Sequence, residues 1–119
     1  MKGGKTMFAK NRLKSVLSVV ALQAKNLFGD KLDSVILFGS YARGDYDDES
    51  DVDIMILADI DNADINEYTK RLREKIFHLE LENDCVLSLC VVSKNNYERF
   101  KEVLPFYRNV SEEGVKIAV

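Results

Sequence analysis

Hydrophobic residues recur in steps of three and four between Phe8 and Phe28, and this spacing predicts an amphipathic helix. The positions on its apolar face are Leu13, Val16, Leu17, Val20, Ala21, Ala24, Leu27 and Phe28. Gly29 follows them, and glycine commonly ends a helix because it adopts left-handed backbone angles without strain. The first predicted element is therefore a helix that buries one face.

Two short apolar runs, Ser34 to Phe38 and Val52 to Leu57, are predicted to be buried strands. Asp59 to Asn62 then supplies turn and capping residues before a second long helix. The predicted buried stripe of that helix comprises Ile65, Tyr68, Leu72, Ile76 and Leu79. The order to this point is helix, strand, strand, helix.

A third strand is predicted for the β-rich run Cys85 to Val92, because Asn83-Asp84 breaks the helical pattern before it. Ser93 is predicted to cap a further helix over Lys94 to Val103. Pro105 is expected to end that helix, since proline lacks the backbone N–H that a helix interior needs.

The remaining residues predict a tail that leads through Gly114 to a short strand candidate, Val115 to Val119. We expect Phe106 and Tyr107 in this tail to close the core, and the alternative is a docking surface for another subunit. No repeat or linker interrupts the order, so residues 1–119 are predicted to form a single α/β (α+β) domain, with 1–7 as a flexible tail. A small mixed sheet of three to four strands flanked by helices fits this order.

Charge and hydropathy exclude two classes of partner. The net charge is −3, and the densest basic group alternates with acids on a predicted helix, so direct nucleic-acid binding is not expected. That group is Lys70, Arg71, Arg73 and Lys75. No apolar run approaches the roughly 18–20 residues that cross a bilayer, and no hydrophobic run follows the basic start of the chain. We therefore expect a cytoplasmic protein that does not enter membranes.

The run from Leu37 to Gly44 contains the first candidate for chemistry. A glycine after a buried strand, here Gly39, lets the backbone turn sharply and approach a ligand. Ser40 to Arg43 can form a short helical turn whose N–H groups and dipole favour an anion such as a nucleotide phosphate. The Ser40 hydroxyl is then available to a phosphate oxygen, although Ser40 could equally be a plain helix cap.

Asp51 and Asp53 supply the second candidate. Residues two apart on a strand point to the same face, about 6.5–7 Å apart, while Val52, Ile54 and Ile56 point to the other face and are predicted to be core. Two like charges this close repel each other unless a cation lies between them. Mg²⁺ is usually held by one or two carboxylates together with substrate phosphates, so these residues are candidate metal ligands.

Other readings of the polar residues were weighed. The acidic loop from Asp45 to Asp51 could be only a solvated hairpin connection, and Asp-x-Asp also occurs in glycosyltransferases, which are much longer chains. Gly4-Lys5-Thr6 copies the end of a P-loop without its preceding strand. We expect structural roles for His78 on the second helix and for the capping or turn residues Asp59, Asp61 and Asp64. Cys85 and Cys90 are expected to be reduced, buried thiols on opposite faces of one strand.

Gly39-Ser40 followed by Asp51-Val52-Asp53 resembles the nucleotidyltransferase fold of the DNA polymerase beta superfamily, and within it the minimal nucleotidyltransferases. Arg43-Gly44 and Ser50 also fit that pattern. The resemblance implies that Asp51 and Asp53 hold Mg²⁺, with Mn²⁺ as the alternative. It also implies that Gly39, Ser40 and Arg43 bind the phosphates of a nucleoside triphosphate, and ATP is the one expected.

The resemblance further implies transfer of AMP to a hydroxyl of a partner protein. Minimal nucleotidyltransferases are commonly paired with a helical HEPN-domain toxin, to which they act as antitoxin. The sequence leaves open two other functions, a non-catalytic antitoxin or regulatory subunit and a transferase for a small molecule such as an aminoglycoside. It also leaves open the oligomeric state.

The third carboxylate of the superfamily site has no clear counterpart. It would be expected on the third strand, where Ser88 occupies the corresponding place. Asp84 is predicted to lie at the very start of that strand, with the same parity as Ser88, and is the candidate within this chain. The alternatives are a ligand supplied by a partner and a site that lacks it.

Overall fold

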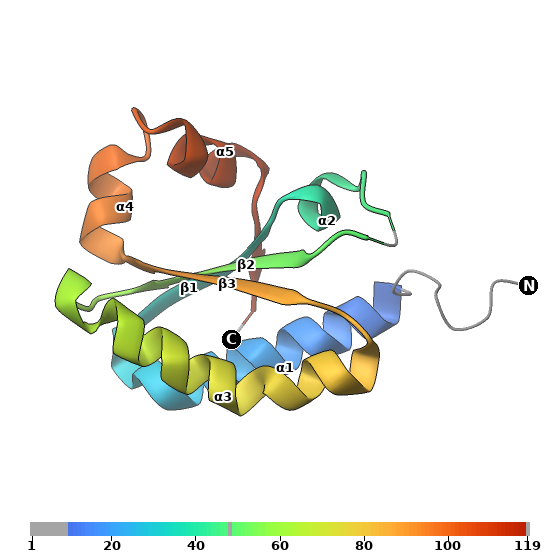
Figure 1. The fold of residues 1–119 in the computed structure, drawn as a ribbon. Helices are drawn as coiled ribbons and strands as arrows, with labels where there is room; N and C mark the ends of the chain where they lie inside the picture. The colour runs from blue at the N-terminus through green and yellow to red at the C-terminus, as the bar shows by residue number, and fades with distance from the viewer. Residues whose placement is uncertain (1–9, 48, 119) are drawn as a thin grey trace, which may run out of the picture.

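A four-stranded sheet forms the centre of the computed structural model, which describes residues 10–47 and 49–118. The helices are α1 (Lys10–Phe28), α2 (Ser40–Arg43), α3 (Ile65–Asn83), α4 (Lys94–Phe100) and α5 (Pro105–Glu113), with two 3-10 turns, η2 (Gly29–Lys31) and η3 (Asn62–Asp64). The strands are β1 (Leu32–Phe38), β2 (Val52–Ala58), β3 (Leu87–Ser93) and β4 (Val115–Ile117). Helices α1 and α3 lie on one side of the sheet, and α4 and α5 lie on the other (Figure 1). The predicted α/β class and mixed sheet are confirmed.

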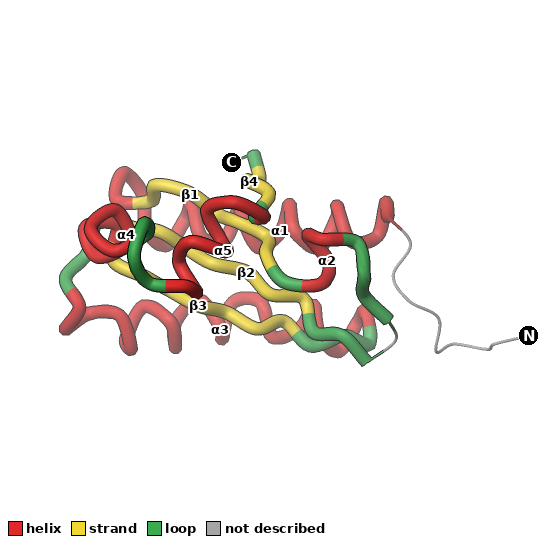
Figure 2. Tube along the Cα trace, turned by 90° about the horizontal axis from the view of Figure 1, so that it is seen from above, coloured by secondary structure: helices red, strands yellow, loops and turns green. Residues whose placement is uncertain are grey.

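The strand order is β3-β2-β1-β4, in which β1 runs antiparallel to both β2 and β4 while β2 and β3 are parallel. Phe38 at the end of β1 pairs with Asp53 near the start of β2, and Asp53 pairs in turn with Ser88. Seen from above, α5 crosses the sheet near this end, close to α2 (Figure 2). The end of β1 and the starts of β2 and β3 therefore lie at the same end of the sheet.

Alternating side chains divide the core between the two faces of the sheet. The face covered by α1 and α3 contributes Val35, Leu37, Val52, Ile54, Ile56, Ala58, Leu87 and Val91 to one buried cluster. The face covered by α4 and α5 contributes Ile36, Met55, Leu57 and Val92 to a second cluster, which Tyr97 and Val110 complete. Since strand residues two apart share a face, Asp51 and Asp53 belong to the α4–α5 face together with Met55.

The two long helices agree with the hydrophobic periodicity. Helix α1 ends at Phe28, and Gly29 follows it with φ +60°, as a glycine helix stop requires. In α3, Leu72, Ile76 and Leu79 are buried, while the two other stripe positions pack against the same cluster. The tail 1–7, the first two residues of the predicted helix and the Gly4-Lys5-Thr6 segment lie outside the described residues.

Pro105 begins a helix instead of ending one. It was expected to end a helix over Lys94 to Val103, but α4 ends at Phe100 and Pro105 begins α5. Proline suits the first turn of a helix, where its missing N–H has no intrahelical acceptor to lose. The predicted tail is therefore a helix of nine residues, and the strand after Gly114 is limited to Val115–Ile117.

Smaller corrections concern the third strand. It begins at Leu87, so Cys85 precedes it, and Ser93 occupies the cap position of α4 without a side-chain capping bond. Cys85 and Cys90 pack against opposite core clusters and are free thiols, as expected, but each is half-buried rather than buried. Burial raises the pKa of both thiols, that of Cys85 to about 11, so neither is an activated nucleophile.

Candidate active site

The turn after β1 is built on Gly39. Its angles, φ +75° and ψ −154°, suit glycine, and its carbonyl accepts hydrogen bonds from the N–H groups of Ala42 and Arg43, each at 3.1 Å. Gly39 is therefore the cap of α2, and Ser40 is the first helical residue; the alternative in which Ser40 is the cap is wrong. Gly44, at φ +89°, ends this single turn of helix.

Gly39 lies directly against the carboxylate of Asp53. A Cβ added to Gly39 would overlap Asp53 Oδ2 and come within 3.1 Å of its Cγ. The close approach follows from the register, because Phe38 pairs with Asp53 and the chain turns over that carboxylate at the next residue. The structure thus brings together the two parts of the motif that are separated by more than ten residues in the sequence.

Asp51 and Asp53 differ in their environments. Asp51 is exposed just before β2, whereas Asp53 is half-buried as the second residue of that strand. Burial, followed by the nearby charge of Asp51, raises the pKa of Asp53, and the guanidinium of Arg43 partly offsets this. A cation beside the two carboxylates would relieve both costs, so the donor set fits a metal that prefers oxygen ligands.

The residues of β3 described by the structure supply no third carboxylate beside Asp53. Ser88 pairs with Asp53 in the parallel ladder and faces the same side of the sheet. Asp84 lies outside β3, contrary to the predicted placement, and forms the left-handed C-cap of α3 at φ +51°. Within residues 10–47 and 49–118, no three or more His, Cys, Asp and Glu side chains gather into a group that could hold a metal ion.

The acidic loop is closed by its own side chains. The carboxylate of Asp47 accepts hydrogen bonds from the Glu49 N–H at 2.9 Å and the Ser50 hydroxyl at 3.2 Å, while the Ser50 Oγ accepts one from the Asp47 N–H at 3.0 Å. The rings of Tyr41 and Tyr46 stack at 4.1 Å between centroids. These contacts fix how the loop leads from α2 into Asp51.

Arg43 is held by two acids from different elements. Its Nε lies 3.2 Å from Asp45 Oδ2, and a terminal guanidinium nitrogen lies 3.6 Å from Glu113 Oε1 at the end of α5. Both ion pairs are partly exposed and raise the pKa of Arg43, with the Asp45 hydrogen bond as the main cause. Arg43 therefore joins the motif to α5, an element that the sequence analysis did not predict.

A cavity of about 380 Å³ lies between the motif and α5. One wall consists of Phe38, Gly39, Ser40, Arg43 and Asp53, and the other consists of Phe106, Asn109, Val110 and Glu113. The second wall was missed because Pro105 was interpreted as a stop. The spacing of three, four and seven residues between its members is the helical signal that could have revealed it.

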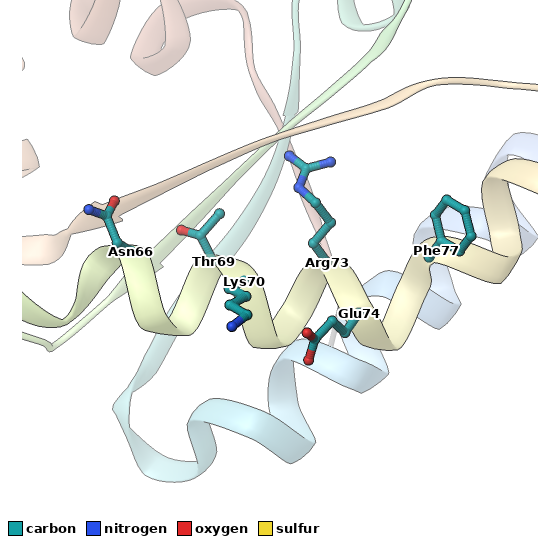
Figure 3. A pocket seen from close by; sticks show the side chains of 6 residues that line it. All are labelled: Asn66, Thr69, Lys70, Arg73, Glu74 and Phe77. Atoms are coloured by element: carbon teal, nitrogen blue, oxygen red, sulfur yellow. The ribbon is translucent and has the colours of Figure 1, made fainter.

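A larger hollow of about 590 Å³ lies along α3, away from the motif. Figure 3 shows its lining residues, Asn66, Thr69, Lys70, Arg73, Glu74 and Phe77, all of which project from this one helix. It contains one carboxylate and no glycine turn, so it lacks both features that phosphate and metal binding require. The smaller cavity beside Gly39 is the better candidate site despite its size.

The predicted solvated face of α3 is confirmed, since Lys70, Arg71, Arg73 and Lys75 are exposed, as is His78.

Comparison with known proteins identifies the family. The model of the family described as "Nucleotidyltransferase domain" matches residues 21–117, which include the glycine turn, both aspartates and α5. The chain belongs to the nucleotidyltransferase domain family. It is thus a nucleotidyltransferase, and the resemblance inferred from Gly39-Ser40 and Asp51-Val52-Asp53 is confirmed.

The relatives of this chain include proteins of Methanocaldococcus jannaschii. The chain is 39% identical over 90 residues to the protein named "Putative protein adenylyltransferase MJ0604", a match that covers 76% of this chain and 82% of the relative. It is 86% identical over 28 residues to "Putative protein adenylyltransferase MJ0141", covering 24% of this chain and 28% of that protein. Both names describe adenylyltransferases, which are one kind of nucleotidyltransferase.

The fold has a counterpart among solved structures. A crystal structure described as a toxin-antitoxin with AMP-PNP superimposes with a TM-score of 0.51 at 23% identity, covering 91% of this chain and 73% of the other. At this identity the likeness concerns the fold alone.

Among the described residues, no helix is both long and apolar enough to span a membrane.

Proposed function

We propose that this nucleotidyltransferase transfers AMP from ATP to a hydroxyl group of a partner protein, with release of pyrophosphate. The observation that carries the proposal is the contact of Gly39 with Asp53, which puts the glycine turn beside two neighbouring carboxylates, a place suited to a phosphate and its metal ion. The name of the M. jannaschii relative supports both the adenylyl group and a protein acceptor.

In this proposal the chain acts by position and charge. The turn at Gly39 and the Ser40 hydroxyl orient the β- and γ-phosphates, because the first N–H groups of a helix lack intrahelical acceptors. Arg43 offers a positive charge to the same phosphates. Asp51 and Asp53 would hold Mg²⁺ or Mn²⁺, which when bound supplies charge neutralisation for the transferred and leaving groups.

The partner is proposed to be a helical HEPN-type toxin, to which the chain would act as antitoxin in the cytoplasm. The support comes from the solved structure of similar fold, which is described as a toxin-antitoxin.

A second function is favoured by one observation, the serine at position 88. Because Ser88 pairs with Asp53, the chain presents a hydroxyl at the place where the superfamily resemblance implies a third acid. A chain that binds ATP and its partner without efficient transfer would be a nucleotide-sensing antitoxin. Asp84 or a residue of the partner is the remaining source of a third ligand for a transferase.

The test is transfer of label from ATP in the presence of Mg²⁺ and host lysate. Label in the α-phosphate is expected to move to a discrete protein band, whereas label in the γ-phosphate is not. Asp51→Asn/Asp53→Asn should abolish the transfer because it removes both proposed metal ligands.

The matched control is Asp59→Asn/Asp61→Asn, which removes two exposed acids of the same spacing beyond the other end of β2. This variant should transfer label like the unmodified chain. Equal labelling by the Asp51/Asp53 variant, or transfer of the γ-label, would refute the proposed reaction. Binding of ATP without any transfer would favour the sensing function instead.

A further inference from the structure

Phe106 is an aromatic side chain that the fold leaves partly outside its core. It keeps 44% of its surface exposed and lines the cavity beside Asp53, whereas its neighbour Tyr107 packs against the second core cluster. The expectation that both aromatics close the core is therefore wrong for Phe106. An aromatic face at the rim of a cavity that also holds an acid and a serine calls for a ligand with a flat apolar part.

Contacts at the two ends of α5 fix the direction of this cavity. At one end, Phe106 meets Phe38 edge to face, with ring centroids 5.4 Å apart, and Phe38 pairs with Asp53. At the other end, Glu113 is paired with Arg43. Phe106 and Glu113 are seven residues apart, so α5 runs about 10 Å along the cavity from the Asp53 end to the Arg43 end.

This order matches the order of groups in a nucleoside triphosphate. If the terminal phosphates lie at Ser40 and Arg43 and the reacting α-phosphate lies at Asp53, the nucleoside continues toward Phe106. The cavity volume of about 380 Å³ is within the range of small-molecule sites, roughly 300–1,000 Å³. The Asn109 carboxamide lies on the same wall, one helical turn further along.

We propose that Phe106 stacks on the base of the bound nucleotide and that α5 is the nucleoside-binding wall of the site. The proposal rests on the proposed function, because it takes the phosphates to lie at the Gly39 turn. Stacking on a phenyl ring does not distinguish one base from another, so Phe106 contributes affinity for a nucleoside in general. In this arrangement the motif holds the phosphates of the ligand and α5 holds its nucleoside.

The test compares two ligands in Mg²⁺ by calorimetry, ATP and inorganic tripolyphosphate, which has the phosphates without the nucleoside. Phe106→Ala is expected to weaken ATP binding by about tenfold, as loss of one base–aromatic stack does, and to leave tripolyphosphate binding unchanged. Phe77→Ala is the matched control, since Phe77 is also exposed but lies on α3, across the sheet, and should alter neither affinity.

A conservative variant provides a direct signal. The chain contains no tryptophan, so Phe106→Trp introduces a single reporter whose ring can still stack. Its fluorescence should change with ATP and not with tripolyphosphate, while Phe77→Trp should respond to neither. This readout also shows that the position can be altered without loss of the fold.

The outcomes separate the two proposals. Unchanged ATP affinity in Phe106→Ala, or an equal loss for both ligands, would overturn the role of Phe106 while leaving the triphosphate site in place. A chain that binds neither ligand would overturn the proposed function and this inference with it. The expected pattern is weaker binding of both ligands in Asp51→Asn/Asp53→Asn and weaker binding of ATP alone in Phe106→Ala.

Discussion

Gly39 owes its identity to two separate constraints, its positive φ and the carboxylate that lies against it. Each can be measured. Replacing Gly39 with alanine should lower the free energy of unfolding, because a side chain at φ +75° and ψ −154° costs about 1–3 kcal/mol and the added methyl group must also displace Asp53. Urea unfolding of the two proteins measures the loss.

Gly29→Ala is the comparison in which an alanine meets a positive φ without a close contact. Gly29 also has positive φ, at +60°, but nothing lies within 4 Å of its added Cβ. Gly39→Ala should therefore destabilise the chain more than Gly29→Ala does, and the excess should shrink when Asp53 is also replaced by alanine. Equal losses for the two glycines would show that the contact with Asp53 carries no energetic weight.

Asp53 is a carboxylate that the fold keeps in an unfavourable environment. Its pKa is raised because it is half-buried and close to Asp51, so the ionised form is less favourable in the folded chain than in water. Functional groups are commonly found in such environments, since the ligand they bind compensates for the lost hydration. The side chain is therefore better suited to binding a cation than to stabilising the fold.

At the level of elements, Gly114 determines how closely α5 approaches β1. A Cβ added there would lie 2.5 Å from the Val110 carbonyl oxygen and 2.6 Å from Ile36 Cγ2. Gly114→Ala should lower the free energy of unfolding by about 1–3 kcal/mol, as overpacking against backbone does. Since Glu113 is the adjacent residue, this variant should also weaken ATP binding. A fully stable Gly114→Ala chain would contradict the close packing of α5.

A second pair of elements, β1 and α4, is joined by Asp33 and Lys94, whose charged atoms lie 3.1 Å apart. Asp33 is the extra residue of a bulge between β1 and β2, and its pKa is lowered first by the Ser34 hydrogen bond and then by Lys94, while burial opposes both. Because the pair is partly exposed, Asp33→Asn should cost about 0.2–1 kcal/mol at neutral pH.

The pH dependence of this cost has a definite sign. A carboxyl with a lowered pKa stabilises the folded state at pH values above its unfolded-state pKa, near 3.8, and this contribution disappears as the pH falls through the folded-state value. The difference between Asp33→Asn and the unmodified chain should therefore vanish in acid. Urea titrations at neutral and acidic pH, with the exposed Asp30→Asn as control, measure it. A difference that persists at the lowest pH would rule out the ionised pair as its origin.

For the molecule as a whole, the sequence predicted what local patterns determine. Repeats of three and four residues defined α1 and α3, and alternation around Asp53 assigned the two faces of β2 correctly. The pairing of Ser88 with Asp53 depends on how two distant strands align, which no local pattern states. Pro105 was misread because proline both ends and begins helices, and only the packing of Val110 against the sheet decides between them.

The wall of the cavity that α5 forms also depends on contacts between residues far apart in the sequence. Phe106 and Glu113 gain their positions from contacts with Phe38 and Arg43, about 70 residues earlier, and neither belongs to a recognisable motif. The motif could be assigned to a family from residue types and spacing, whereas the α5 wall of the cavity required the fold.

The pairing of β4 with β1 has a practical consequence for handling this protein. Val115 pairs with Leu37, two residues before Gly39, so the last described strand is clamped beside the turn that begins the site. A purification tag, fluorophore or surface tether attached after Ile117 would pull on β4 and, through it, on β1, the strand that leads into Gly39. Attachments are better placed on the exposed outer face of α3, where the sheet separates them from the cavity.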